Sequence, residues 1–353
     1  MNSECLIVTI SDYENMGNRL QNYAVYKSLE KYGAIVGTKG KSKFYLKFII
    51  KQLCMSLPNI PYMSKIIWGK SYRKYLFWNF SSKIPTIYKC FDGNEVEISK
   101  NVRWVFYGSD QIWNPEFGPR NCIIPVTPIS KNVAICASIG ADSIPDEKIQ
   151  DYKLGLARFT YISVREDKAA DIVEKITGNR PVVLIDPTLS IERSVWSKLE
   201  RKPCGINNKK YIFLYFLGQL SEKRKTEIKL LSEKLGVDVI NANDSNIKKI
   251  IGPSEFLWLI HNSVMVITDS YHGSIFSFIF DKSFYILNRE DEEIKMSMNS
   301  RFDTLFNKLK LSDRRCDDIS GYAVEHDYSR SYELLNDEVK KYYSFINTVI
   351  GDK

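Results

Sequence analysis

The stretch "VMVITDSYHGSIFSFIFDKSFYIL", residues 264–287, decides the fold class of this chain. It starts with an apolar run, passes through a short polar turn into a segment of helix-forming length, and ends in a second apolar run. Two strand-length apolar runs joined in this way are typical of neighbouring parallel strands, because parallel strands need a long crossover that is usually a helix. The sequence therefore predicts strands at 264–268 and 284–287 with a helix at 273–280.

The same alternation of strand and helix extends towards the N-terminus of this half of the chain. Continuous apolar runs indicate parallel strands that helices cover on both faces, and Gly236 stands where a helix C-cap belongs. We expect residues 187–353 to form a small Rossmann-like domain. Its further strands are expected at 211–217 and 237–241, and its further helices at 221–235, 254–261 and 332–353.

The first half shows the same pattern less regularly, so we expect residues 1–186 to form an N-terminal Rossmann-like domain. Two such domains that face each other across a cleft make a GT-B-like architecture. A length of 353 residues suits two domains better than one. The predicted strands of the first half are 5–10, 104–107, 133–137, 159–164 and 182–185, and the predicted helices are 17–31, 146–157 and 166–176.

The composition excludes several classes of protein. Apolar residues make up 44% and charged residues 26% of the chain, and no stretch has the roughly 18 apolar residues of a membrane span. The seven cysteines include no Cys-x-x-Cys pair, and there are only three histidines. This pattern indicates reduced thiols in the cytoplasm, with no disulfide framework, metal site or resident cofactor.

The positive charge is concentrated in one segment. Between Lys31 and Phe91 there are 12 Lys or Arg residues and no acid, and the rest of the chain carries 38 basic and 42 acidic residues. Residues 39–83 therefore look like a basic helical insertion in the first domain, and nothing resembles a nucleic-acid-binding module. Within it, residues 39–80 interleave lysines with aromatic and aliphatic side chains. Such a segment suits peripheral contact with an anionic membrane, and the alternative is a helix that packs on the first domain.

Polar residues gather where four of the predicted strands end, which is the edge at which open α/β sheets bind ligands. The first group, "NMGNRLQN" at 15–22, opens a helix whose free N–H groups and amide side chains suit sugar hydroxyls. The second, "YGSDQIWNP" at 107–115, sets amides and a carboxylate beside an indole. A capped turn whose Trp113 packs into the core is the alternative interpretation.

The third and fourth groups favour binding of an anion. In "SVRE", residues 163–166, an arginine at a strand end can bind a carboxylate or phosphate through two N–H groups, although a surface salt bridge is the more common use. In "TDSYHGS", residues 268–274, we expect His272 at a helix N-terminus with the N–H groups of Gly273 and Ser274 exposed. We expect the other two histidines, His261 and His326, to have no part in a site.

With these motifs in place, the chain resembles the polysaccharide pyruvyl transferase family over roughly residues 5–315. The resemblance implies an enzyme that transfers pyruvate from phosphoenolpyruvate to two hydroxyls of one sugar, with formation of a cyclic ketal and release of phosphate. It also implies a role in exopolysaccharide or capsule biosynthesis in bacteria. The elements that follow one another in the family's order are "GSDQIWNP" at 108–115, "SVRE", "IDPTL" at 185–189, "VITDSYHG" at 266–273 and "NSRFDTL" at 299–305.

The resemblance also implies site residues. Arg165 matches a donor-binding arginine, and His272 matches a histidine implicated in donor binding and catalysis. Some members have Arg-Leu-His where this chain has Ser270-Tyr271-His272, so Arg301 or Arg289 must complete the donor clamp. The donor side then consists of Arg165, Ser270, His272, Gly273, Ser274 and Arg301, and the expected acceptor side consists of Asn18, Gln21, Asn22, Asp110 and Gln111.

The expected partners are phosphoenolpyruvate and a sugar or lipid-linked oligosaccharide, at the inner face of the cytoplasmic membrane. Two alternative functions stay open at this point. A GT-B glycosyltransferase that uses a nucleotide sugar would need a carboxylate on the ribose, for which Glu255 is a candidate, but the basic partner is absent. A non-catalytic member of the family would bind a glycan only, which the presence of both Arg165 and His272 disfavours.

Overall fold

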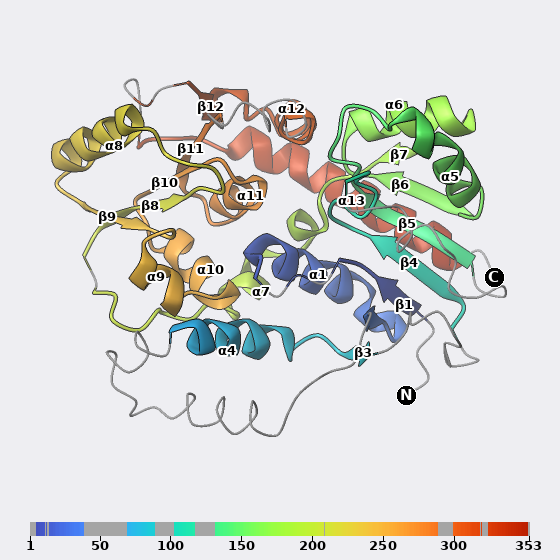
Figure 1. Cartoon of the computed structure of the whole chain (residues 1–353), viewed down its shortest axis with the longest axis horizontal. Coiled ribbons are helices and arrows are strands. Elements are labelled where there is room, and N and C mark those ends of the chain that lie inside the picture. The colour runs from blue at the N-terminus through green and yellow to red at the C-terminus, as the bar shows by residue number, and fades with distance from the viewer. Residues whose placement is uncertain are drawn as a thin grey trace.

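The computed structural model describes residues 5–10, 12, 14–38, 69–88, 102–116, 131–207, 209–288, 299–317, 319 and 324–351. Within these residues the chain forms two parallel β-sheets, each with its own set of helices (Figure 1). The predicted fold class, two Rossmann-like α/β units in a GT-B-like arrangement, is confirmed. The last strand of the first sheet ends at Val183 and the first strand of the second begins at Tyr211, on either side of the expected boundary.

The first sheet has seven strands in the order β3-β2-β1-β4-β5-β6-β7, and each neighbouring pair is parallel. Side chains of a strand alternate between the two faces, so Cys5 and Ile7 enter one core cluster while Leu6 and Val8 enter the other. The strands are β1 (Cys5–Val8), β2 (Ile35–Thr38), β3 (Thr86–Tyr88), β4 (Trp104–Gly108), β5 (Lys131–Ala137), β6 (Tyr161–Val164) and β7 (Val182–Val183).

The first helix of this unit shows how the sequence sets helix ends. α1 (Met16–Leu29) begins where the Asn15 side chain accepts the N–H of Asn18, and a 3₁₀ turn prolongs it to Gly33. Gly33 has φ 67°, a left-handed conformation that glycine adopts without strain. The other helices of the unit are α4 (Gly69–Ser81), α5 (Asp146–Leu156) and α6 (Asp167–Thr177).

The second sheet has five strands in the order β12-β11-β10-β8-β9, again all parallel. Its strands are β8 (Tyr211–Tyr215), β9 (Asp238–Asn241), β10 (Met265–Thr268), β11 (Ser283–Leu287) and β12 (Arg315–Cys316). Its helices are α8 (Glu222–Leu235), α9 (Ser245–Ile250), α10 (Pro253–His261), α11 (Tyr271–Ile279) and α12 (Asn299–Leu309).

One hydrophobic core joins the two units. Trp196, on the short helix α7 (Arg193–Ser197), is fully buried and contacts Tyr23 of α1 on one side and Phe276 of α11 on the other. The ring centroids of the two pairs lie 5.6 and 4.9 Å apart. Aromatic packing of this kind fixes α1 of the first unit against α11 of the second, which matters for the site described below.

The C-terminal helix returns to the first unit. α13 (Ser329–Gly351) follows the second sheet in sequence but runs beneath the strands of the first, as Figure 1 shows. Phe345 contacts Tyr161 of β6, and the Tyr343 hydroxyl donates to the carbonyl of Ser190. Near its start, the Tyr332 hydroxyl donates to the carbonyl of Phe278 in α11, so this helix contacts both units.

Most predicted elements lie within a few residues of the observed ones, with clear omissions. The short strands β2, β3 and β12 and the helices α7, α9 and α12 have no counterpart among the predictions. Trp113 is fully buried and packs edge-on against Phe159, so the core interpretation of this indole is confirmed.

The basic insertion is described only in its last part, which contains α4, and there the helix packs largely on the protein core, as the alternative interpretation expects. Tyr72, Phe77 and Phe80 of α4 are buried in the shared core, where Phe80 contacts Tyr23. The side chain of Arg73 donates to carbonyls of Glu14 and Ile251, which ties α4 to both units. These three aromatic side chains are therefore not available to a membrane, and Trp78 is only partly exposed. Residues 39–68 lie outside the described residues.

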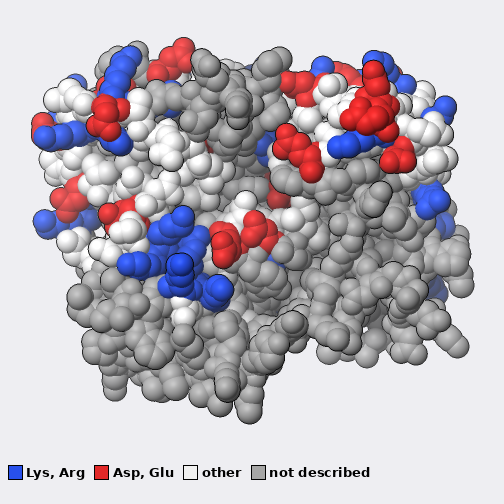
Figure 2. Space-filling view, viewed as in Figure 1, with Lys and Arg blue, Asp and Glu red and all other residues white. Residues whose placement is uncertain are grey.

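The surface of the described residues is mixed in charge. Figure 2 shows basic and acidic side chains interspersed on one face, with one basic group near its centre. Lys70 and Lys74 of α4 and Lys248 of α9 are exposed. None of the described helices has the length and apolar character that crossing a membrane requires.

Candidate active site

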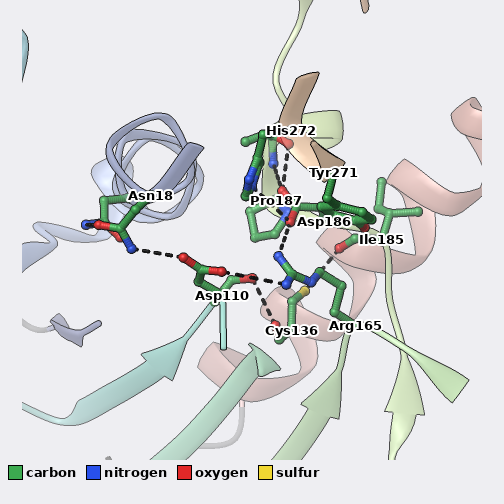
Figure 3. A network of polar contacts seen from close by, with 12 residues as sticks. Asn18, Asp110, Cys136, Arg165, Ile185, Asp186, Pro187, Tyr271 and His272 are labelled. Carbon is green, nitrogen blue, oxygen red and sulfur yellow. Dashed lines mark hydrogen bonds and ion pairs between the residues drawn. The ribbon is translucent and has the colours of Figure 1, made fainter. Parts of the chain in front are cut away.

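The candidate site lies where strand ends of the first sheet meet the start of α11 from the second unit. Asp110 follows β4, Arg165 follows β6 and Asp186 follows β7, all at carboxyl ends of parallel strands. His272 is the second residue of α11, directly after β10. Figure 3 shows these side chains together with Asn18 of α1, so the site is built from both units.

Arg165 and Asp186 form the buried centre of the network. Nη1 of Arg165 lies 2.6 Å from Oδ2 of Asp186, and neither side chain is exposed to solvent. The other carboxylate oxygen of Asp186 accepts the N–H and the hydroxyl of Thr188. Asp186 is therefore held by Arg165 at one carboxylate oxygen and by Thr188 at the other. Of the Arg165 guanidinium, it contacts Nη1.

The other end of the Arg165 guanidinium is less engaged. Nη2 lies 3.7 Å from Oδ1 of Asp110 and Nε lies 3.8 Å from Oε2 of Glu166, which are ion-pair distances but longer than hydrogen bonds. Both nitrogens are buried without a hydrogen-bond partner among the described residues. These two nitrogens thus have ion-pair neighbours but no hydrogen bond, and they can still donate to an anionic ligand.

Glu166 stabilises the loop that follows β5. Its Oε1 accepts the hydroxyl of Ser138 and the N–H groups of Ile139 and Gly140, so it fixes the loop that follows β5. Gly140, at φ 60°, lies against the side chain of Gln111. Glu166 therefore sets the position of the predicted acceptor residue Gln111 through this loop.

His272 reaches into the first unit. Its Nε2 lies 3.7 Å from Oδ2 of Asp186, the same oxygen that Arg165 contacts, and Nε2 is buried without a hydrogen bond to the described residues. On its other side the ring lies against Gly17 of α1. The imidazole thus stands between a carboxylate and the first turn of a helix.

Asp110 connects this centre to α1. Its Oδ2 accepts Nδ2 of Asn18 at 3.0 Å, and its backbone adopts the left-handed conformation with φ 67°. The carboxylate keeps a side-chain exposure of 16%, in contrast to the enclosed Asp186. Asp110 is therefore the carboxylate of the network that a substrate can reach.

A second buried arginine comes from α12. The guanidinium carbons of Arg301 and Arg165 lie 5.6 and 4.8 Å from the ring centre of Tyr271. Nε and Nη2 of Arg301 are buried and have no hydrogen-bond partner among the described residues. Two cations thus flank one aromatic ring at the start of α11.

The electrostatics follow from burial and from these neighbours. Burial disfavours the charge of Asp186, but His272 and Arg165 outweigh that effect and hold its pKa well below its usual range. Burial likewise opposes the charge of Asp110, and Arg165 and His272 outweigh it, so the pKa of Asp110 is lowered. Burial and the nearby Arg165 charge lower the pKa of Arg301 to about 10. Both carboxylates therefore stay ionised at neutral pH.

The other residues predicted for the donor side, Ser270, Gly273 and Ser274, form hydrogen bonds with one another at the start of α11. The hydroxyl of Ser270 caps the helix by accepting the N–H of Gly273, and the N–H of Ser274 donates to the carbonyl of Ser270. These N–H groups are not exposed, in contrast to the sequence-based expectation. Arg289, named as a substitute for the missing loop arginine, lies outside the described residues.

Only some of the residues predicted to bind the acceptor lie in the polar network of the site. Asn22 accepts the Thr9 hydroxyl and donates to the Ile10 carbonyl, so it holds the loop between β1 and α1. Gln21 is fully buried, and neither polar atom of its side chain has a hydrogen-bond partner among the described residues. Asn18 and Asp110 do meet in the network.

Asp186 and Gly17 are parts of the site that residue patterns did not single out. Asp186 stands in the "IDPTL" element, which served as a family signature and as a domain boundary. A carboxylate at the end of a predicted parallel strand was the signal that could have found it. Glu255 caps α10 through the N–H of Gly252 and pairs with Arg201, so it is occupied structurally.

Several solved structures are similar to the chain at low sequence identity. Among solved structures, a glycosyltransferase from Rickettsia africae is similar at 12% identity and a TM-score of 0.47, covering 100% of both chains. A UDP-GlcNAc 2-epimerase from Methanocaldococcus jannaschii has 13% identity and a TM-score of 0.45, covering 95% of this chain and 91% of that one. A UDP-GlcNAc 2-epimerase from Neisseria meningitidis has 10% identity and a TM-score of 0.41, covering 96% and 99%.

No curated protein sequence matches the chain significantly. The family model described as polysaccharide pyruvyl transferase matches residues 15–291, which include α1, the Arg165 and Asp186 loops and the start of α11. That match spans well over half of the sequence, and the chain belongs to the polysaccharide pyruvyl transferase family.

Proposed function

We propose that the protein transfers pyruvate from phosphoenolpyruvate to two hydroxyls of a sugar in a polysaccharide repeat unit, giving a cyclic ketal and phosphate. Family membership supports transfer of this kind, and the geometry supports an anionic donor. The observation that carries the proposal is a set of five buried nitrogens without hydrogen-bond partners among the described residues: Nε and Nη2 of Arg165, Nε and Nη2 of Arg301, and Nε2 of His272.

Buried donors without a hydrogen bond are costly, at roughly 1–3 kcal/mol each, so their presence in one place favours a ligand that accepts hydrogen bonds from them. Arg165 and Arg301 share the Tyr271 ring, and Arg165 and His272 share the Asp186 carboxylate, which puts all five nitrogens in one region. Carboxylate and phosphate oxygens are the acceptors that arginine binds best. Phosphoenolpyruvate carries both groups.

The chemistry then needs a proton donor and control of charge. Protonation of C3 of the donor makes C2 cationic, and one sugar hydroxyl adds to C2 with loss of its proton. The bond from C2 to the phosphate oxygen breaks, with the electron pair leaving on phosphate, and the second hydroxyl adds to C2 and loses its proton. One proton enters at C3, one ends on phosphate, and two leave the sugar.

Each step has a group in the network. His272 is the acid–base group that delivers and accepts protons, because an imidazole can do both near neutral pH. Asp110 is ionised and partly exposed, so it can accept a hydrogen bond from a sugar hydroxyl and stabilise positive charge at C2. Asn18 orients Asp110 through its Nδ2 group, and Gln21 and Gln111 are assigned to the acceptor as part of this proposal.

We further propose that the acceptor is a lipid-linked oligosaccharide at the inner face of the cytoplasmic membrane, and that lysines of residues 39–68 contribute to peripheral membrane contact. The basic composition of that segment supports this part of the proposal. Tyr72, Tyr75, Phe77 and Phe80 of α4 do not take part, because they are buried.

The test follows phosphate release when the protein is mixed with phosphoenolpyruvate and a panel of sugars and lipid-linked saccharides. The proposal expects release that depends on the acceptor, together with a product heavier than the acceptor by the mass of the pyruvate ketal. A response to nucleotide sugars only would favour a glycosyltransferase, although Glu255, the residue suited to that role, is occupied by Arg201 and Gly252. Glycan binding without release would favour a non-catalytic member.

A further inference from the structure

Gly17, the second residue of α1, lies directly against the ring of His272. A Cβ atom added to Gly17 would stand 2.3 Å from Nδ1, 2.6 Å from Cγ and 2.9 Å from Cβ of His272. These distances are far below van der Waals contact, and they involve the base of the side chain as well as its tip. No residue other than glycine therefore fits at this position with the ring where it is.

Asp186 bounds the ring on the Nε2 side. Its Oδ2 lies 3.7 Å from Nε2, and the carboxylate itself is fixed by Arg165 and Thr188. The His272 ring is therefore bounded by the backbone of α1 on the Nδ1 side and by the fixed Asp186 carboxylate on the Nε2 side.

The two boundaries come from the first unit, whereas His272 comes from the second. Gly17 starts α1 and Asp186 follows β7, both in the part of the chain that forms the first sheet. The imidazole of His272 thus lies between two residues of the other unit, Gly17 and Asp186. Its orientation depends on the docking of α1 against α11, which the buried Trp196 contacts also maintain.

We propose that Gly17 is a positioning residue: its lack of a side chain lets α1 close against His272, so that Gly17 and Asp186 together fix the imidazole in one orientation. The inference rests on the proposed function, because the value of that orientation is proton transfer by His272. A side chain at position 17 would tilt the ring away from Asp186 or push α1 back, and the latter would also move Asn18 away from Asp110.

The direct test is Gly17→Ala, with Gly351→Ala as the matched control. Alanine forms helices more readily than glycine, so the intrinsic effect on α1 is favourable and any loss must come from the contact. We expect kcat of Gly17→Ala to fall on the order of 10–100-fold, as misplacement of a reacting group by about 1 Å does. Gly351 is also helical, and an added Cβ there would meet nothing within 4 Å, so its variant should keep wild-type kcat.

A double-mutant cycle separates positioning from a general effect on the fold. In a His272→Gly background both the ring and the Cβ atom that a side chain at position 17 would meet are absent, so Gly17→Ala should cause no further loss of kcat. A further drop in kcat of the same size in that background would overturn the proposal, and so would wild-type kcat of the single variant.

A measurement that does not use activity distinguishes failure of this inference from failure of the proposed function. The chain has only three histidines, so their ring signals in NMR spectra can be assigned by replacing His261, His272 and His326 in turn with glutamine. Gly17→Ala should shift the signals of His272 and leave those of the other two unchanged. Unchanged His272 signals would overturn the positioning role even in an active enzyme. A selective shift in a protein without pyruvyl transfer would support the contact and reject the reaction.

Discussion

Asp186 and Arg165 form an ion pair in which neither side chain reaches solvent, with 2.6 Å between Oδ2 and Nη1. Such a pair stabilises a fold mainly because its members cannot be separated without leaving a bare buried charge. Here it ties the end of β6 to the end of β7, and the same oxygen faces His272. One carboxylate thus joins the packing of the first sheet to the candidate catalytic group of the second unit.

Asp186→Asn should destabilise the protein by about 3–5 kcal/mol at neutral pH, because Arg165 would lose its charged partner. The folded pKa of Asp186 is lowered below the unfolded value of about 3.9, so its contribution is complete above that pH and is lost as the pH falls towards the folded pKa. Urea unfolding at pH 7 and pH 3 should show a difference between wild type and variant that shrinks by up to about 1.4 kcal/mol per pH unit below 4. Asp171→Asn, at an exposed pair with Arg180, is the control and should cost at most about 1 kcal/mol at either pH. An equal Asp186→Asn effect at both pH values would contradict the prediction.

His272→Ala should lower turnover by about 10²-fold or more while the protein stays folded, because loss of a general acid–base group has an effect of that size. The measurement is kcat for acceptor-dependent phosphate release, with circular dichroism to check the fold. His261→Gln is the control: that ring stacks on Phe280 and contacts Glu200, away from the site, so kcat should not change. Turnover of His272→Ala near the wild-type value would remove the residue from the mechanism.

Arg301→Gln should raise the KM for phosphoenolpyruvate with a smaller effect on kcat, since its unpaired N–H groups are assigned to binding of the donor. Loss of a charged hydrogen bond of about 1.5–3 kcal/mol corresponds to roughly 10–150-fold. Arg180→Gln, at a surface arginine, is the control. A donor KM that stays unchanged in Arg301→Gln would exclude the assigned role.

Arg165→Lys gives a complementary prediction. Lysine keeps the charge beside Asp186 but cannot hold that carboxylate and present a second N–H group in the fixed geometry of the fork. We expect donor binding to weaken by roughly 1–3 kcal/mol, measured as apparent donor KM. Stability should fall less than in Asp186→Asn, because a cation stays opposite the carboxylate. Unchanged donor KM would make Arg165 a structural anchor of Asp186 only.

The parts of the fold that the sequence predicted are those with strong local signals. β8 and β10 are continuous apolar runs, and α8 ends at Gly236, whose left-handed conformation (φ 64°) makes it the C-cap. β2 and β3 carry no comparable signal: they have four and three residues, and their stability comes from pairing with a neighbouring strand. Tertiary pairing of this kind is not visible in a local pattern.

The same contrast between local sequence signals and tertiary contacts holds for the candidate site. The positions of Arg165 and His272 at strand ends were predictable, because topology alone brings such ends to one edge. The contact between Gly17 and His272 depends on how two separate sheets dock, which no periodicity encodes. The N–H groups of Gly273 and Ser274 were expected to be exposed, because the sequence did not show that Ser270 caps α11. In the structure they donate to the Ser270 hydroxyl and to the Ser270 carbonyl, respectively.

The last prediction concerns the basic insertion. Lys43, Lys47 and Lys51 lie outside the described residues, in a segment without acidic residues. Because four of the five aromatic side chains of α4 are buried and Trp78 is half-buried against the core, we expect binding to a membrane through this part of the protein to be mainly electrostatic, at on the order of 1 kcal/mol per lysine. Replacing the three lysines with glutamate should therefore weaken sedimentation with anionic vesicles by roughly 10²-fold or more. Binding of the wild type should rise with the anionic lipid fraction and fall with salt, since the attraction is screened.

The matched control makes the same change in net charge elsewhere. Lys223, Lys225 and Lys229 are exposed on α8 of the second unit, so their replacement with glutamate removes as much positive charge from a different surface. That variant should sediment like the wild type if the insertion is the contact. Equal loss in both variants would mean that only net charge matters, and equal binding to neutral and anionic vesicles would reject electrostatic contact through the lysines. Because a lipid-linked acceptor would be presented at that surface, vesicles that carry the acceptor should lower its apparent KM for the wild type more than for the Lys43, Lys47 and Lys51 variant.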